Sequence, residues 1–118
     1  MANGSVSSIV KALFDIGLAP QVKLSAINWL GPSTYAPVVV GTPPALATGG
    51  DVITAAAFGL KTIETLEGGV TWDGNYLVVP TRRNATTWVL TWIVIATGLQ
   101  AGAITLNTST VRLSAIGL

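Results

Sequence analysis

The stretch Thr87-Trp88-Val89-Leu90-Thr91-Trp92-Ile93-Val94-Ile95-Ala96 decides the fold, because it lies in a segment without charged residues, 84–111, that suits either a strand or a membrane helix. Its even-numbered positions are all apolar, whereas its odd-numbered positions mix threonine with valine and isoleucine. This period of two is typical of a β-strand. Valine, isoleucine, threonine and tryptophan also pack well on a pleated surface. The segment therefore predicts a strand.

A membrane-spanning helix is the alternative interpretation of the same segment. Arg82 and Arg83 precede it, about nineteen mostly uncharged residues follow, and Gly98 and Gly102 have the GxxxG spacing of membrane helix pairs. Polar residues such as Gln100 lie inside the span, and the two glycines are more typical of a turn between strands. We therefore expect no membrane span, and a small single-span membrane protein stays as an alternative.

The rest of the chain also has the pattern of short strands separated by glycine and proline. The strongest turn signal is Asp73-Gly74-Asn75, which predicts a hairpin whose second strand ends at Pro80. Thr54 could cap a single helical turn over 55–58 that ends at Gly59. Alternation of apolar and polar residues predicts further strands at 22–29, 35–40, 60–66, 70–72, 76–79 and 110–116. This pattern predicts an all-β fold, an antiparallel β-sandwich or a jelly-roll-like arrangement.

The N-terminal segment has a different apolar spacing from the strands. Its apolar residues recur at helical spacing, with Ser5 as a cap and Gly17 as a stop. Two alternatives follow: a short helix that covers the core of its own domain, or an arm that contacts a neighbouring subunit. We therefore divide the chain into an N-terminal helix or arm, 1–20, and a single β domain, 21–118. The candidate contact residues of the N-terminal segment are Val6, Ile9, Val10, Leu13 and Phe14.

Composition limits the functions that the chain can have. Only 9% of its 118 residues are charged, against about 25% in an average protein, so we expect much of the surface to be covered by other subunits of a homo-oligomer. The chain has no cysteine and no histidine, and its five carboxylates form no motif for metal binding or glycoside cleavage. We therefore expect no enzyme, no metal and no cofactor. A net charge of +1 also argues against nucleic-acid binding.

Two pairs of residues in the second half of the chain are candidate contacts with a partner protein. Trp72 and Tyr76 flank the predicted hairpin turn, and aromatic side chains are favoured at interfaces. Arg82 and Arg83 form the chain's only adjacent basic pair. No secretory signal is evident at the start of the sequence, so we expect an intracellular compartment.

Two segments resemble a known family. The sequence ATGGDVITAAAFGLKTIE at 47–64 resembles a segment common in small virion proteins of tailed bacteriophages, and LSAIGL at 113–118 is similar too. The resemblance implies a head cement, or decoration, protein. Such proteins are β-rich and form small oligomers, a trimer being favoured over a dimer, on the outer surface of the capsid. Residues before Gly31 depart from the family's pattern.

The resemblance also implies a partner and a location. The partner would be the major capsid protein, with neither nucleic acid nor membrane involved, and the chain would be made in the host cytoplasm before it joins the virion. A structural component of the phage tail or baseplate is the alternative function.

Overall fold

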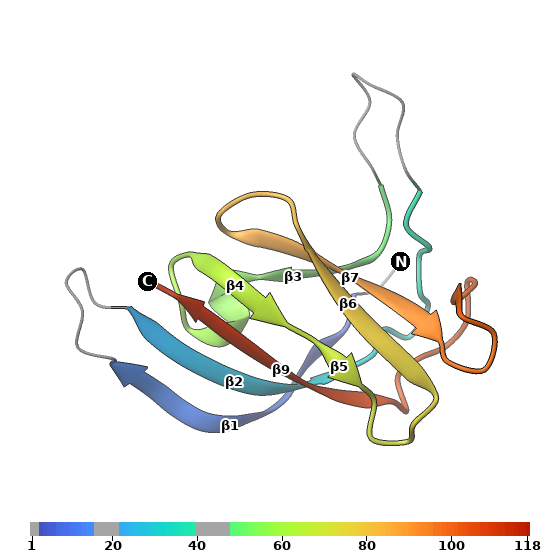
Figure 1. The fold of residues 1–118 in the computed structure, drawn as a ribbon, viewed down its shortest axis with the longest axis horizontal. Coiled ribbons are helices and arrows are strands. Elements are labelled where there is room, and N and C mark those ends of the chain that lie inside the picture. The colour runs from blue at the N-terminus through green and yellow to red at the C-terminus, as the bar shows by residue number, and fades with distance from the viewer. Residues whose placement is uncertain (1–2, 16–21, 40–47) are drawn as a thin grey trace.

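The structure is a computed structural model that describes residues 3–15, 22–39 and 48–118, with the backbone alone over 8–15. Within these residues nine strands form two antiparallel sheets (Figure 1). The first sheet has the order β1 (Ser5–Asp15), β2 (Lys23–Leu30), β9 (Thr110–Gly117) and β4 (Ile63–Glu67). The second has the order β3 (Asp51–Thr54), β7 (Thr87–Val94), β6 (Tyr76–Arg82) and β5 (Gly69–Val70), and β8 (Leu99–Gln100) pairs with β7. The prediction of an all-β sandwich is confirmed.

The decisive segment is a strand. It forms β7, which lies between β3 and β6 in the second sheet. The alternation seen in the sequence has a direct structural cause, because Trp88, Leu90 and Trp92 point into the molecule and are 9%, 0% and 0% exposed. In the described residues, every helix is too short or too polar to cross a bilayer.

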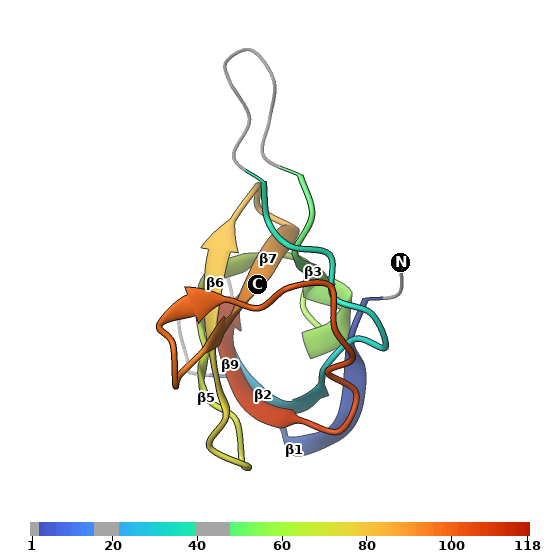
Figure 2. The same cartoon turned by 90° about the vertical axis from the view of Figure 1, so that its right-hand side faces the viewer.

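The core lies between the two sheets, which face each other across it when the sandwich is seen from its end (Figure 2). Ile27 and Leu113 enter from the first sheet, Leu90 and Val78 enter from the second, and each is at most 1% exposed. Burying a side chain of this size contributes about 1.5–3 kcal/mol to folding. Alternate residues of each strand therefore supply most of the stability of the sandwich.

The N-terminal segment is not a helix. Residues 5–15 form β1, which lies at the edge of the first sheet and pairs with β2 in the register Val6↔Trp29 and Phe14↔Leu24. The register shifts at three places along this pair. Each shift interrupts the period of two, so the apolar spacing of an irregular strand can imitate that of a helix. The alternative role of this segment, as an arm on a neighbouring subunit, stays a prediction.

The strand predicted at 35–40 is wrong over its described part, 35–39, where the structure has only an isolated bridge between Val39 and Thr48. Position 40 lies outside the described residues. Pro37 in this segment has no N–H to donate to a ladder, and the side chain of Tyr35 is fully buried in the core. The backbone of Tyr35 instead donates a hydrogen bond to the carbonyl of Ile104, over 2.9 Å.

The predicted hairpin is present between β5 and β6, with Gly74 in the left-handed region at φ 76°. Pro80 does not end its second strand but lies inside β6, opposite Leu90 of β7. Successive residues of a strand direct their N–H groups to opposite neighbours, and the N–H of Arg83 donates to the Thr87 carbonyl of the β7 side. The nitrogen of Pro80 therefore points away from β7, toward β5. It interrupts no pairing there, because β5 pairs only with residues 77 and 78.

The predicted helical turn is also present, as the 3-10 helix η1 (Ala55–Phe58). It ends at Gly59, whose φ of 71° is the left-handed conformation that glycine adopts without strain. The side chain of Thr54 makes no capping hydrogen bond, so this detail of the prediction is wrong.

Candidate functional site

A buried carboxylate joins the two sheets inside the sandwich. Asp51, at the start of β3, is 1% exposed, and its Oδ2 atom accepts hydrogen bonds from Nε1 of Trp29, over 2.7 Å, and Nε1 of Trp92, over 3.2 Å. Its Oδ1 atom accepts a third hydrogen bond, over 2.7 Å, from the backbone N–H of Gly4. Burial raises the pKa of the Asp51 carboxyl, and the hydrogen bonds from Trp29, Gly4 and Trp92 partly oppose that rise. So enclosed a carboxylate cannot reach a substrate, and its role is structural.

A second polar network leads from the core to the surface. The hydroxyl of Tyr35 accepts a hydrogen bond from the Trp92 backbone N–H and donates one to Oε1 of Gln100, over 2.8 Å. The same Gln100 amide accepts from Val38 N and donates to Val38 O. Burial is the main reason why the pKa of Tyr35 is raised. The side chain of Gln100 thus holds the backbone of residue 38 beside β8 through two hydrogen bonds.

The turn between β5 and β6 is fixed by the carboxylate of Asp73. Its Oδ1 atom accepts hydrogen bonds from Thr71 Oγ1, over 2.6 Å, and Asn75 N, over 3.0 Å, and its Oδ2 atom accepts one from Ser109 Oγ, over 2.7 Å. The hydrogen bond from Thr71 is the main reason why the pKa of Asp73 is lowered. The backbone N–H of Trp72 also donates to the carbonyl of residue 110, so the turn is attached to the start of β9.

Large apolar side chains are exposed at the end of the sandwich that holds this turn. The segment 71–75 and the segment 95–109, which includes β8, lie at this end, which faces the viewer in Figure 2. The backbone of Ile95 donates a hydrogen bond to the Asn75 carbonyl, which connects the two segments. We call this surface the loop end and define it by four side chains with exposed fractions of 63%, 46%, 69% and 41%: Trp72, Ile95, Leu99 and Ile104.

The outward side of the second sheet is a second exposed surface. Cross-strand pairs Leu77↔Ile93 and Val79↔Thr91 lie on this side, and Val70 lies beside Leu77. Val70 is 54% exposed, and Leu77 and Val79 are each 37% exposed. We call this surface the outer face and define it by six residues, none of them charged: Val70, Leu77, Val79, Thr81, Thr91 and Ile93. Val89 lies on the same side of the sheet but is only 3% exposed.

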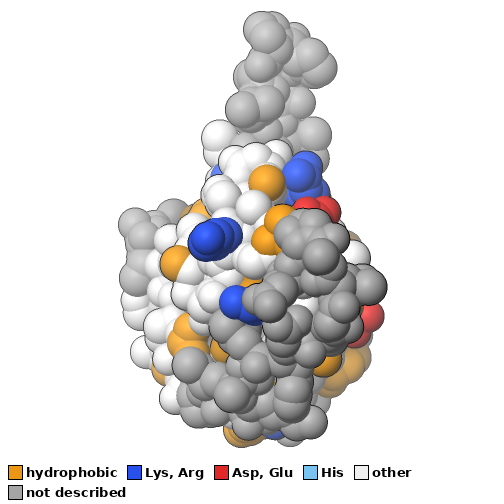
Figure 3. Space-filling model, turned by 90° about the vertical axis from the view of Figure 1, so that its left-hand side faces the viewer, with side chains coloured by type: hydrophobic (Ala, Val, Ile, Leu, Met, Phe, Trp, Pro, Cys, Tyr) orange, Lys and Arg blue, Asp and Glu red, His pale blue; other side chains and the backbone are white. Residues whose placement is uncertain are grey.

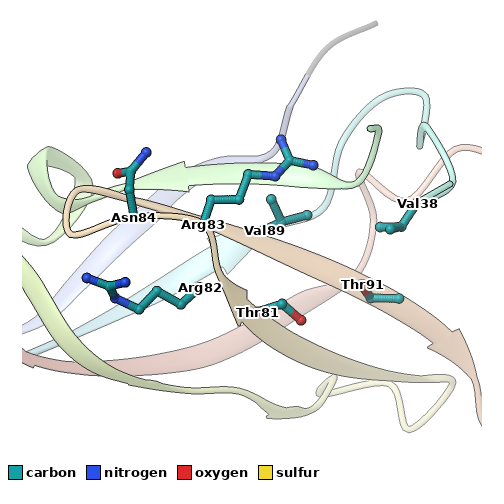
Figure 4. A pocket seen from close by; sticks show the side chains of 7 residues that line it. All are labelled: Val38, Thr81, Arg82, Arg83, Asn84, Val89 and Thr91. Atoms are coloured by element: carbon teal, nitrogen blue, oxygen red, sulfur yellow. The ribbon is translucent and has the colours of Figure 1, made fainter. Parts of the chain in front are cut away.

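A groove of about 420 Å³ lies at one end of the outer face (Figure 4). Gly50 makes it possible for the chain to pass close to Val38 and Val89, because a Cβ at this position would collide with both side chains. Arg83 lies along the groove, and its Nη2 atom is 3.4 Å from the Gly49 carbonyl. The lining residues are Val38, Thr81, Arg82, Arg83, Asn84, Val89 and Thr91.

The residues proposed from the sequence lie on three separate parts of the molecule. Trp72 is exposed, whereas Tyr76 is half-buried and packs edge-on against Trp92, with ring centroids 5.8 Å apart. Arg82 and Arg83 are exposed at the opposite end of β6, so the length of a strand separates them from Trp72. Figure 3 looks onto that opposite end, where basic side chains lie among hydrophobic, uncharged and a few acidic ones.

The N-terminal candidates all belong to β1. Val6 is 37% exposed, whereas the side chains of the other four lie outside the described residues: Ile9, Val10, Leu13 and Phe14.

Sequence reasoning missed the Asp51 network. Its donors come from residues 4, 29 and 92, and no spacing in the sequence connects these positions. In the part of the chain that the structure describes, no three acidic side chains cluster as metal ligands. No family model, curated protein or solved structure matches the chain.

Proposed function

We propose that this chain is a structural virion protein, a head cement subunit that binds the outer surface of a tailed-phage capsid and stabilises the lattice of the major capsid protein. One observation supports it most. The loop end exposes Trp72 and Leu99, 63% and 69% of whose surface meets water, on segments that hydrogen bonds hold in place. Large exposed apolar side chains are typical of protein-binding surfaces, and tryptophan is the side chain most often found to dominate binding energy.

The rigidity of the turn matters for this proposal. Asp73 accepts three hydrogen bonds, so the turn that carries Trp72 is ordered before it meets a partner. Binding then needs less loss of conformational freedom, and more of the apolar contact energy appears as affinity. Each contact can still be weak, because a lattice repeats it many times and the copies act together. The resemblance of 47–64 and 113–118 to virion proteins supports a capsid as that lattice.

Cosedimentation with phage heads tests the proposal. Purified chain is mixed with undecorated heads of the phage that encodes it, and the copies bound per particle are counted over a range of concentrations. We expect saturable binding with a fixed number of copies per major capsid subunit. The variant Trp72→Ala should bind at least about 30-fold more weakly, as expected when an anchor that contributes about 2 kcal/mol is removed.

The matched control is Val39→Ala, because Val39 is similarly exposed, at 61%, but lies outside the loop end. This variant should bind heads as the unchanged chain does. Absence of the chain from pelleted heads, or equal weakening by both variants, would contradict the proposal. Binding to purified tails or baseplates in place of heads would assign the chain to the alternative structural role.

A further inference from the structure

We infer that the groove beside Arg83 binds an extended, acidic segment of a partner protein. The segment places a carboxylate against the Arg83 guanidinium and an apolar side chain against Val38 and Val89. Charge is the first reason for this choice of ligand. Among the described residues that line the groove, two are arginines and none is acidic. An anionic segment is therefore attracted to the groove, whereas a cationic one is repelled.

Arg83 is the residue that directs positive charge into the groove. Its side chain lies along the groove, whereas the side chain of Arg82 points away from Val89 (Figure 4). The Arg83 Nη2 atom lies 3.4 Å from the Gly49 carbonyl, so the guanidinium reaches across to the opposite wall. A guanidinium has five N–H donors in a planar fork, so it can bind a carboxylate through two of them while it also contacts a carbonyl.

Both walls of the groove are held in place before a ligand arrives. On one side, the Gln100 side chain makes two hydrogen bonds to the backbone of Val38. On the other side, Oδ1 of Asn84 accepts three hydrogen bonds, two from Thr86 and one from Thr87 N. Binding therefore requires little ordering of the groove itself, and more of the contact energy appears as affinity.

The floor of the groove suits an extended chain better than a small anion. Val89, Thr91 and Thr81 lie on one side of the second sheet, where side chains two residues apart along a strand are about 6.8 Å apart. An extended peptide has the same repeat. Beyond the groove, the same side continues with Val79 and Leu77, each 37% exposed. A peptide covers these aliphatic side chains, and a small anion does not.

The volume of the groove limits how much of the partner enters it. At about 420 Å³, it lies near the lower end of the range for ligand sites, about 300–1,000 Å³. A single contact of this size is weak, so it suits a partner that is held at a second site as well. The groove and the loop end lie at opposite ends of β6, and the inference does not depend on the head cement role.

Nuclear magnetic resonance titration of the isotope-labelled full chain tests the inference. The ligand is an end-capped peptide of five residues, with valine at its first and last positions, glutamate in the middle and serine between them. The control peptide has glutamine in place of glutamate. We expect saturable shifts of the signals of Val38, Arg83 and Val89. The control peptide should bind about 10-fold more weakly or worse, because it lacks the charge that Arg83 holds.

Two variants with matched controls test the groove. Arg83→Gln should weaken binding of the acidic peptide about 10-fold or more, whereas Arg112→Gln, which removes the same charge from an exposed position of β9, should bind as the unchanged chain does. Thr81→Tyr should block the groove without a change of charge. Thr65→Tyr, at an exposed threonine of β4, should leave binding intact. Far-ultraviolet circular dichroism should show all four variants folded.

Absence of binding, equal affinity for the two peptides, or equal weakening by the two arginine variants would overturn the inference. Inorganic phosphate that saturates the same signals while the peptide does not would assign the groove to a small anion instead. The same shifts on concentrating the chain without peptide would assign it to a second copy, and either result would also overturn the inference. Head binding is measured separately, with Trp72→Ala, so failure of one proposal leaves the other in place.

Discussion

Replacing Trp29 by phenylalanine should destabilise the fold more than the same replacement at Trp88. Both side chains are buried, at 4% and 9% exposed, and both belong to the core. They differ in their polar atoms. Trp29 Nε1 donates to the carboxylate of Asp51 over 2.7 Å, whereas Trp88 Nε1 has no hydrogen-bond partner among the described residues. The comparison therefore isolates one hydrogen bond to a buried charge.

The expected magnitude follows from these contacts. A hydrogen bond to a charged group contributes about 1.5–3 kcal/mol. The smaller ring also leaves a cavity of roughly 40 Å³ at either site, which costs about 1 kcal/mol. Trp29→Phe should therefore lower the free energy of unfolding by about 2.5–4 kcal/mol. Trp88→Phe should change it by about 1 kcal/mol or less, because removing an unsatisfied buried N–H offsets the cavity.

Urea unfolding measures the difference. Far-ultraviolet circular dichroism is the suitable signal, because each variant changes the tryptophan fluorescence. The gap between the variants should shrink at low pH, since protonation of Asp51 weakens the hydrogen bond that only Trp29 makes. Equal destabilisation by the two replacements, or a larger loss at Trp88, would refute the view that Asp51 joins the sheets through its indole donors.

Four further predictions concern the pH dependence of stability and two single replacements. Burial raises the pKa of the Asp51 carboxyl above 3.8, so the folded chain binds the carboxyl proton more tightly than the unfolded chain does. The free energy of unfolding should therefore fall as pH rises from 3.8 through the pKa that Asp51 has in the folded chain. Hydrogen bonds lower the pKa of the Asp73 carboxyl, so its contribution to the free energy of unfolding should be lost as pH falls below 3.8. Urea titrations at several pH values check the direction of both pH effects. Gly59→Ala should lower the free energy of unfolding by about 1–2 kcal/mol, because φ is 71° there, and thermal unfolding would show it. Gln100→Ala should speed proteolytic cleavage near Val38, which loses two hydrogen bonds. It should also lower the free energy of unfolding by about 1–3 kcal/mol, because the buried Tyr35 hydroxyl loses its acceptor.

The parts of the fold that could be predicted from the sequence are those in which one face of a strand is buried. β7 and β9 have an apolar residue at every second position because that side chain enters the core, and Asp73-Gly74-Asn75 is a typical turn sequence in which glycine adopts a positive φ. In β2 the pattern misleads, because Leu24 is exposed and Ser25 is buried. The strand β1 could not be predicted, because three register shifts interrupt its period of two. The strand predicted at 35–40 was wrong over residues 35–39, where Pro37 cannot donate to a ladder and the chain forms only the isolated bridge from Val39 to Thr48.

The candidate surfaces divide in the same way. Exposure of Trp72 could be expected from its place beside a turn, whereas Tyr76, on the other side of that turn, packs on Trp92. The outer face could not be foreseen, because β6 has apolar residues on both of its sides and the sequence does not tell which side faces the core. The groove beside Arg83 could not be foreseen either. It forms where the backbone at Gly50 lies close to Val38 and Val89, and this contact joins segments that are distant in the sequence.

The amino-acid sequence by itself determined the secondary structure of most of this chain and the absence of cysteine and histidine chemistry, because both follow from residue types and their local spacing. Only the tertiary structure decided that Asp51 lies between Trp29 and Trp92, and that apolar side chains gather at one end of the sandwich and on one sheet. The physical reason is that these features depend on how the two sheets are connected and stacked. Contacts between strands distant in the sequence leave no periodic trace in it.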